Sequence, residues 1–267
     1  MTEQPMHPTM LITGGSSGIG LATARLFASR GYRVYEMSRS GTGGDGIVHI
    51  AADVTRPDDC QRAVGQVVAD AGRLDVVICN AGMGISGAAE FASADEMHRQ
   101  MEVNFFGAVN VVQAVLPTLR AQRSGRILMV SSMAATFSIP FQSFYSASKS
   151  AMNDFAMALR NEVRPWGIGV ACLLPGDVHT GFTAARRKST IGQDVYPAMT
   201  RSVSVMEHDE NVGQDADRIA RRLLRLATCR FLPVYNYEGW DYRLLALLEK
   251  LLPATLVNWA VGRLYRS

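Results

Sequence analysis

Short apolar runs alternate with longer stretches of mixed polarity along most of the chain. The short runs are mostly apolar, and several of them end in Asn or Ser. Such runs are typical of strands that are buried on both faces of a parallel sheet. The predicted strands are Met10–Thr13, Arg33–Ser38, Ile47–Ala51, Val76–Asn80, Arg126–Ser131, Gly169–Leu174 and Phe231–Val234.

The longer stretches repeat their apolar residues with a helical period. The predicted helices are, approximately, Gly18–Arg30, Pro57–Ala71, Asp95–Leu119, Ser143–Arg164 and Gln214–Ala227. Alternating strands and helices predict an α/β protein of the Rossmann type: a doubly wound, seven-stranded parallel sheet with helices on both faces. No linker divides the chain, so we expect a single domain over residues 1–267, with an apolar helical tail at about 238–267. Ligands of such sheets bind beyond the carboxyl ends of the strands.

The loop after the first predicted strand is rich in glycine and serine, with Thr13 to Gly20 reading TGGSSGIG. Glycine lets backbone N–H groups approach a phosphate, and the N-terminus of the following helix also favours an anion. The spacing differs from the common GxGxxG form, and no GxxxxGK[ST] of an ATP-type loop is present. The predicted phosphate-binding residues are Gly14, Ser16, Ser17, Gly18, Ile19 and Gly20.

The end of the second predicted strand bears on the choice of nucleotide. An acidic residue there would accept hydrogen bonds from an adenosine ribose and repel a 2′-phosphate. This strand ends instead in Ser38 and Arg39, and a guanidinium pairs well with phosphate. The sequence therefore favours NADP(H) over NAD(H), with Arg39 as the residue that would bind the 2′-phosphate.

A serine, a tyrosine and a lysine follow the fifth predicted strand. Ser132 comes at its end, and Tyr145 and Lys149 are one helical turn apart on a helix that begins near Ser143. A carbonyl reduced by hydride needs a proton, which the Tyr145 hydroxyl could supply while Ser132 holds the oxygen. We expect the nearby ammonium of Lys149 to lower the pKa of Tyr145 from its usual value of about 10.

These motifs, in this order, resemble those of the short-chain dehydrogenase/reductase family, in its single-domain branch. The resemblance runs from about Met10 to Val234. It implies an NAD(P)-dependent oxidoreductase acting on CH–OH groups, with an adenine-contacting Asp53, a neighbouring cofactor-binding Val54, and a catalytic group of Asn104, Ser132, Tyr145 and Lys149. In the family, the counterpart of Asn104 holds a water that passes protons through the lysine. The remaining matched positions, which by resemblance contact the cofactor, are Asn80, Ala81, Gly82, Pro175, Gly176, Val178 and Thr180.

The resemblance also implies a homodimer or homotetramer, formed through the helices at 104–119 and 143–164. Both helices carry small and apolar residues on more than one face, which suits burial against a partner. Those residues are Ala108, Val111, Val112, Ala114, Ala147, Ala151, Phe155 and Ala158.

The loops around the predicted site are mainly apolar, which suits a small hydrophobic carbonyl or alcohol substrate. The stretch from Pro175 to Phe182 resembles that of hydroxysteroid and retinol dehydrogenases, so a steroid-, retinoid- or lipid-like molecule is expected. Two alternatives remain: a 3-oxoacyl thioester reductase, and a dinucleotide-sensing scaffold on the same fold. The basic residues Arg186, Arg187 and Lys188 are interpreted as a solvent-exposed face.

The tail from Tyr242 to Tyr265 places leucines around a helix that Pro253 interrupts. Three interpretations are open. Packing on the domain or on a neighbouring subunit is favoured, a roof over the substrate cleft comes second, and peripheral contact with a membrane is the least favoured.

Composition and the N-terminal residues bear on possible partners, metal sites and cellular location. The net charge of +3 is too small to indicate nucleic acid binding. The four cysteines show no metal-ligand spacing and suggest buried free thiols, and no metal site is predicted. Met1 to Met10 lack the apolar core of a signal peptide, so a cytoplasmic protein is expected.

Overall fold

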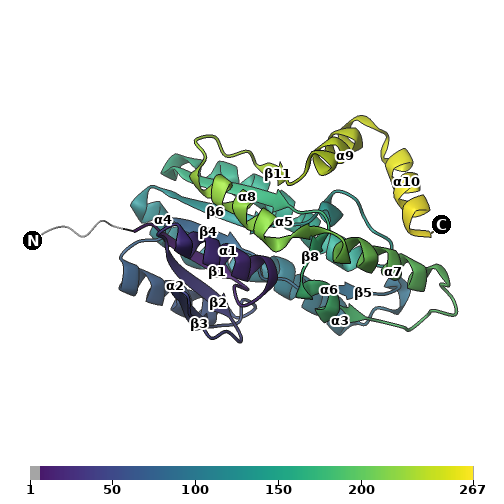
Figure 1. The fold of residues 1–267 in the computed structure, drawn as a ribbon, viewed down its shortest axis with the longest axis horizontal. Helices are drawn as coiled ribbons and strands as arrows, with labels where there is room; N and C mark the ends of the chain where they lie inside the picture. The colour runs from purple at the N-terminus through teal and green to yellow at the C-terminus, as the bar shows by residue number, and fades with distance from the viewer. Residues whose placement is uncertain (1–6, 267) are drawn as a thin grey trace, which may run out of the picture.

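The computed structural model describes residues 7–266, and its centre is a seven-stranded sheet in which every neighbouring pair of strands is parallel (Figure 1). The strand order is β11-β7-β6-β4-β1-β2-β3, so the chain starts near the middle of the sheet and builds outward in both directions. The strands are β1 (Thr9–Thr13), β2 (Arg33–Ser38), β3 (Ile47–Ala51), β4 (Val76–Cys79), β6 (Gly125–Val130), β7 (Ile168–Leu174) and β11 (Tyr235–Tyr237).

Helices cover both faces of this sheet and divide the apolar core into two layers. Helices α1 (Gly18–Ser29) and α8 (Ala216–Thr228) lie in front of the strands in Figure 1, where Phe27 and Leu223 are fully buried with the side chains of one sheet face. Helices α2 (Pro57–Ala71), α4 (Gly107–Gln122) and α5 (Ser143–Val163) bury their apolar residues against the other face. The doubly wound architecture predicted from the alternating pattern is therefore confirmed.

Smaller elements gather around the carboxyl ends of the strands. Strand β5 (Ile85–Ser86) pairs with β9 (Arg187–Lys188), and β8 (Val178–His179) pairs with β10 (Gln214–Asp215). The remaining helices are α3 (Ala94–Met101), α6 (Gly181–Ala185), α7 (Ala198–Asn211), α9 (Trp240–Leu251) and α10 (Ala254–Arg266), and short 3₁₀ turns cover Ala89–Phe91, Met133–Ala135 and Arg164–Trp166.

The seventh strand is displaced from its predicted position at Phe231–Val234. Phe231 is 80% exposed, and Pro233 has no N–H to give to a neighbouring strand. Pairing with β7 begins when the Cys172 N–H donates to the Val234 carbonyl, and the strand itself is Tyr235–Tyr237. The apolar character of the predicted run misled the assignment, because the strand contains two tyrosines and an asparagine.

The predicted helix at Asp95–Leu119 is one helical run with an irregular middle. A capping box between Ser93 and Glu96 starts α3, and a π-helical turn at Glu102–Phe106 separates α3 from α4. The predicted helix at Gln214–Ala227 also begins later, because Gln214 and Asp215 form strand β10 before α8 starts.

Contact with a partner subunit would account for only some of the apolar residues on helices α4 and α5. Ala108, Val111 and Val112 lie in the core of the single chain, so their apolar character needs no second copy. Phe106 on the π-helical turn and Met157 on α5 are, in contrast, 45% and 40% exposed. The oligomer remains a prediction that rests on this exposed surface.

Residues 1–6, part of the stretch in which we expect no signal peptide, lie outside the described residues. Within residues 7–266 no helix is long and apolar enough to cross a membrane, and no group of three or more His, Cys, Asp or Glu side chains could hold a metal ion. The cysteines are unpaired thiols; Cys79 and Cys172 are buried, and burial raises the pKa of each to about 12.

Candidate active site

One large cavity of about 1070 Å³ opens at the carboxyl ends of the central strands. Its walls come from the loops after β1, β2, β3, β4, β6 and β7, and from the tail helices. Every predicted cofactor or catalytic residue lines it except Gly20 and Asn104. The residues predicted from the strand ends, from Gly14 to Lys149, and those implied by the family resemblance, up to Thr180, therefore lie around one cavity.

The glycine-rich loop has a shape that larger residues would not permit. Gly14 and Gly18 have φ angles of +64° and +50°, in the left-handed region that favours glycine. Gly20 lies behind the cavity wall, where an added Cβ would be 2.1 Å from the Gly14 carbonyl oxygen. A Cβ on Gly18 would lie 3.4 Å from Thr180, so the loops after β1 and β7 approach each other closely. This leaves an open cradle of backbone that fits a dinucleotide phosphate.

Asn80 joins the first and fourth strands at the site. Its side-chain amide donates to the carbonyl oxygens of Thr13 at 3.0 Å and Gly14 at 3.2 Å. The Thr13 hydroxyl accepts in return from the backbone N–H groups of Asn80 and Ala81, at 3.0 and 2.9 Å. Asn80 therefore fixes the glycine-rich loop as well as lining the cavity.

The cavity wall after β2 carries an exposed cation, Arg39, whereas the carboxylate of Glu36 nearby is buried. Arg39 is exposed and lines the cavity. Glu36 is 2% exposed and forms an ion pair with His49, and it also accepts from the Ser38 hydroxyl at 3.3 Å. Asp53 lines the same part of the cavity, where its Oδ1 accepts from the backbone and the hydroxyl of Thr55.

Tyr145 and Lys149 lie together on the first turns of α5, beside Ser132. The Lys149 Nζ is 5.9 Å from the centre of the Tyr145 ring and donates to the Val130 carbonyl at 2.9 Å. The Ser132 Oγ accepts from the Ala134 N–H at 3.1 Å. All three side chains face the cavity, as their spacing predicted.

The electrostatics of this group differ from the expected ones. Burial raises the pKa of Tyr145 to about 12, and a hydrogen bond with Ser132 and the charge of Arg186 oppose that rise. Burial also lowers the pKa of Lys149 to about 8. The expected net lowering of the Tyr145 pKa is wrong for this arrangement, because desolvation by burial outweighs the groups that favour the phenolate.

Asn104 lies on the π-helical turn behind the cavity and is fully buried. Its amide nitrogen donates to the Met83 carbonyl at 3.0 Å and to the Ser148 hydroxyl at 3.1 Å, while its Oδ1 accepts from the Met83 N–H at 2.8 Å. Turns of this kind are rare inside α-helices and are frequent at functional sites. The side chain thus links the loop after β4 to α5, next to Lys149.

Arg186 is the clearest feature that the sequence did not reveal. It was expected to be exposed, but it is 5% exposed and lies in a buried ion pair with Glu210, which also accepts from the Thr183 hydroxyl at 2.6 Å. The Arg186 guanidinium lies over the Phe182 ring, whose centre is 6.0 Å from that of Tyr145. A charged pair therefore borders the space where a substrate carbonyl would meet Tyr145.

The tail lies over the same cavity, so the structure favours the roof among the three interpretations. Tyr242 anchors it: a Cβ on Gly176 would fall 1.9 Å from the Tyr242 ring, which shows how closely the ring covers this loop. The Tyr242 hydroxyl donates to Asp177 Oδ2 at 2.9 Å and accepts from the Asp177 N–H at 3.1 Å. The other tail residues that line the cavity are Leu245, Leu248, Glu249, Leu252, Val257, Ala260, Val261, Leu264 and Tyr265.

Comparison with known proteins agrees with this geometry. Residues 8–190 match the family model described as short chain dehydrogenase. A 3-ketodihydrosphingosine reductase from Bacteroides thetaiotaomicron is 37% identical over an alignment of 266 positions, which covers 97% of this chain and 99% of that protein. An 11-beta-hydroxysteroid dehydrogenase 1A from Arabidopsis thaliana is 34% identical, over 100% of this chain and 78% of the relative. A crystal structure of a short-chain dehydrogenase from Streptomyces avermitilis superimposes with a TM-score of 0.84 at 27% identity, covering 98% of this chain and 99% of that one.

Proposed function

Because this chain belongs to the short-chain dehydrogenase/reductase family and is an NAD(P)-dependent oxidoreductase acting on CH–OH groups, we propose that it uses NADP(H) to reduce the ketone of a long-chain lipid such as 3-ketodihydrosphingosine. The observation that carries this proposal is that polar catalytic side chains and an apolar wall line the same cavity. Tyr145 and Ser132 lie on one wall, and the apolar side chains of α9 and α10 form another. A substrate with a ketone and an alkyl chain fits both.

The cofactor supplies the hydride when it is bound. The backbone cradle from Gly14 to Gly20 would hold its phosphates, and Val178 and Thr180 would hold the nicotinamide carboxamide. Arg39 would pair with the 2′-phosphate, since the neighbouring Glu36 is turned inward and paired with His49. This supports NADP(H) over NAD(H).

The proton comes from this chain's own residues. The Ser132 and Tyr145 hydroxyls would hydrogen-bond the substrate carbonyl oxygen, and Tyr145 would give its proton as negative charge develops there. At a pKa of about 12 the Tyr145 hydroxyl is protonated at neutral pH, as a proton donor must be. Lys149 would stabilise the phenolate that remains, and Asn104 would position the loop and the helix around it.

The relatives favour a lipid substrate over the thioester alternative. The Bacteroides relative is named for the reduction of 3-ketodihydrosphingosine. Its alignment covers 97% of this chain, and therefore includes the tail as well as the catalytic core. The steroid possibility keeps support from the hydroxysteroid dehydrogenase relative. A scaffold without activity is disfavoured because the proton-donor group is complete.

A substrate panel tests the proposal. The protein would be mixed with NADPH and, in turn, with 3-ketodihydrosphingosine, a ketosteroid, retinal and a 3-oxoacyl thioester, and the loss of NADPH absorbance followed. We expect the highest kcat/KM with the keto sphingoid base. A preference for the thioester would contradict the proposed substrate, and a lack of turnover with all four would contradict the proposed activity.

A further inference from the structure

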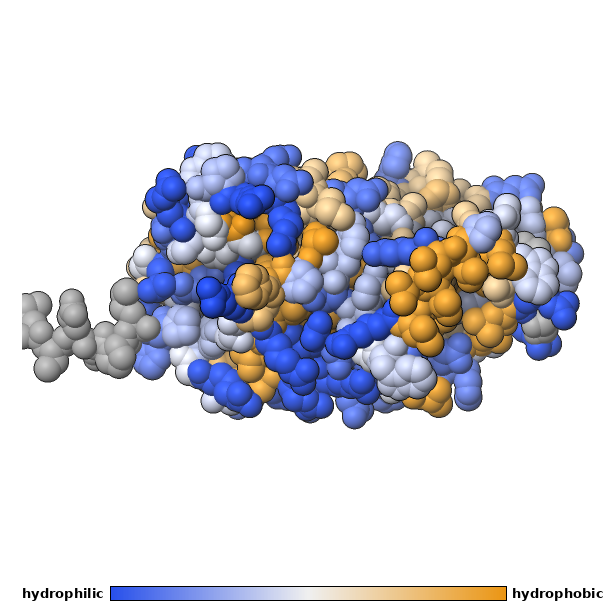
Figure 2. Space-filling view, turned by 90° about the horizontal axis from the view of Figure 1, so that it is seen from above, coloured by the Kyte–Doolittle hydropathy of each residue, from blue (hydrophilic) through white to orange (hydrophobic). Residues whose placement is uncertain are grey.

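The outward side of the tail is an apolar surface, separate from the side that lines the cavity. We define the tail face as the exposed apolar residues of α9 and α10 that do not line the cavity: Trp240, Leu244, Leu247, Leu251, Leu256 and Trp259. Trp240 is 77% exposed and Leu251 is 70% exposed. Figure 2 views the molecule from the side on which these helices lie and shows hydrophobic residues gathered over that half. Contiguous apolar surface of this kind marks a binding surface.

The tail face continues into the cavity. Leu245, Leu248, Leu252 and Leu264 line the cavity and are also 39–61% exposed, so they form its rim. An alkyl chain could pass from an apolar phase outside, over these leucines, to the wall that faces Tyr145 without entering water. A second copy of the chain seated on the tail face would instead close this entrance.

The charges and lengths of the helices fit a bilayer surface. Arg243, Lys250 and Arg263 are exposed basic residues on these two helices. The acidic residues are Asp241, which is exposed in the first turn of α9, and Glu249, which lines the cavity, so basic residues predominate on the exposed side. Leucine and tryptophan beside basic residues are typical of helices that lie in the plane of a membrane interface. With 12 and 13 residues, α9 and α10 are too short to span a bilayer, and no described helix could cross one.

We propose that the tail face binds the surface of a bilayer that contains anionic phospholipid, and that a lipid substrate enters the cavity from the bilayer across the leucine rim. The binding follows from the surface alone, whereas the entry of substrate rests on the proposed function. The apolar residues would sit among the acyl chains near the headgroups, and the basic residues would attract the anionic headgroups.

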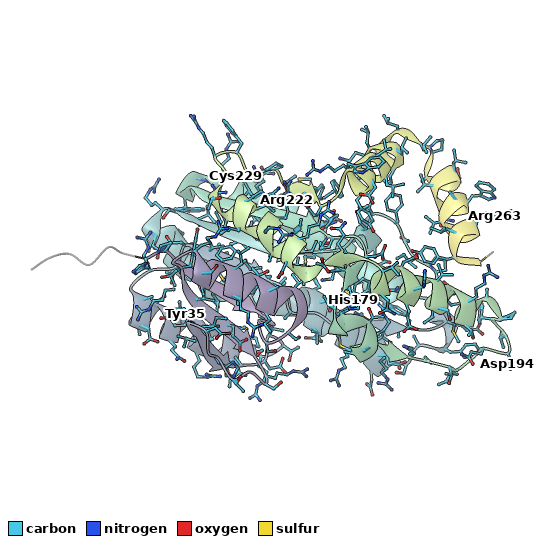
Figure 3. All side chains as sticks on the ribbon, in the orientation of Figure 1. Tyr35, His179, Asp194, Arg222, Cys229 and Arg263 are labelled. Carbon is cyan, nitrogen blue, oxygen red and sulfur yellow. The ribbon has the colours of Figure 1, made fainter. Side chains whose placement is uncertain are left out.

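Vesicle flotation with the full-length protein tests the binding. The vesicles would be phosphatidylcholine alone, or phosphatidylcholine with phosphatidylglycerol, and the variant L247S/L251S/W259S would remove three residues of the tail face. The matched control is F231S, because Phe231 is 80% exposed but belongs to the loop after α8 and not to the tail. Cys229, two residues before it, lies toward the left of the molecule in Figure 3, whereas Arg263 of α10 lies at the right.

We expect the wild type and F231S to float with the anionic vesicles, and the triple variant to float about tenfold less, because buried apolar area sets such partition. Reduction of a short soluble ketone should be unchanged in the triple variant, while reduction of a long-chain ketone embedded in vesicles should fall. The proposal is overturned if the wild type does not float, if the triple variant floats as well as the wild type, or if the substitutions only dissociate an oligomer. Vesicle binding without any ketone reduction would contradict the proposed function and leave the binding surface intact.

Discussion

Replacing Glu210 by Gln tests how much the buried Arg186–Glu210 ion pair, which lies beside the proposed proton donor, contributes to stability. The Arg186 side chain is 1% exposed, and Glu210 holds it through two carboxylate oxygens while also accepting from Thr183. The amide keeps the size of the side chain but removes its charge. The guanidinium then stays buried without a counterion, and its Nε already lacks a hydrogen-bond partner. Breaking a buried pair in this way typically costs about 3–5 kcal/mol in the free energy of unfolding. We expect the lower end of that range, because the Glu210 side chain is 15% exposed.

Urea unfolding followed by circular dichroism measures this difference. The control is Asp45→Asn, which breaks the pair of Arg25 with Asp45 at 3.4 Å, where both side chains are at least 60% exposed. A surface pair contributes less than about 1 kcal/mol, so the control should unfold almost like the wild type. Equal losses in the two variants, or a loss below about 1 kcal/mol for Glu210→Gln, would refute the view that burial makes this pair important.

Further predictions concern the proton donor, the cofactor and the tail. Tyr145→Phe should lower kcat about 10²–10⁴-fold, the usual cost of losing a positioned acid, while NADPH titration shows unchanged affinity; near-full activity would contradict the role of proton donor. The reduction rate should fall as pH rises through about 8, where Lys149 loses its proton, and Lys149→Met should abolish this step in the pH–rate profile. Because the folded pKa of Lys149 is lowered, its burial should cost stability fully below pH 8 and progressively less up to about pH 10.4, so the free energy of unfolding should rise over that interval. Arg39→Asp should reduce the preference for NADPH over NADH by about tenfold or more, as expected when a charge-assisted hydrogen bond is lost; an unchanged ratio of the two kcat/KM values would contradict it. Tyr242→Phe should raise KM for a long-chain ketone more than for a short one, since it releases the tail from Asp177, and equal effects on both would argue against that anchor.

The sequence predicted the positions of site residues where a general rule of sheet topology applies, and it failed where a contact depends on tertiary packing. Strand ends meet at one edge of a parallel sheet, so the glycine-rich loop, Arg39 and the group of Ser132, Tyr145 and Lys149 could be placed in one site without coordinates. The family resemblance added the positions up to Thr180. Arg186 could not, because its burial depends on α6 meeting α7 and bringing Glu210 from 24 positions away. The same holds for Tyr242, whose contact with Gly176 depends on how the tail folds back. The pKa of Tyr145 was mispredicted because spacing shows a neighbouring charge but not the depth of burial.

The dependence of kcat/KM on alkyl chain length tests most directly whether the polar group at Tyr145 and the apolar side of the tail serve one substrate. A series of 3-ketones that differ only in chain length would be reduced with NADPH under conditions that keep each ketone dispersed. Burial of one methylene contributes about 0.8 kcal/mol, so kcat/KM should rise up to about fourfold per added carbon until the chain fills the space below α9 and α10. A value that stays flat, or falls, from short to long chains would show that the tail does not hold the substrate of this site.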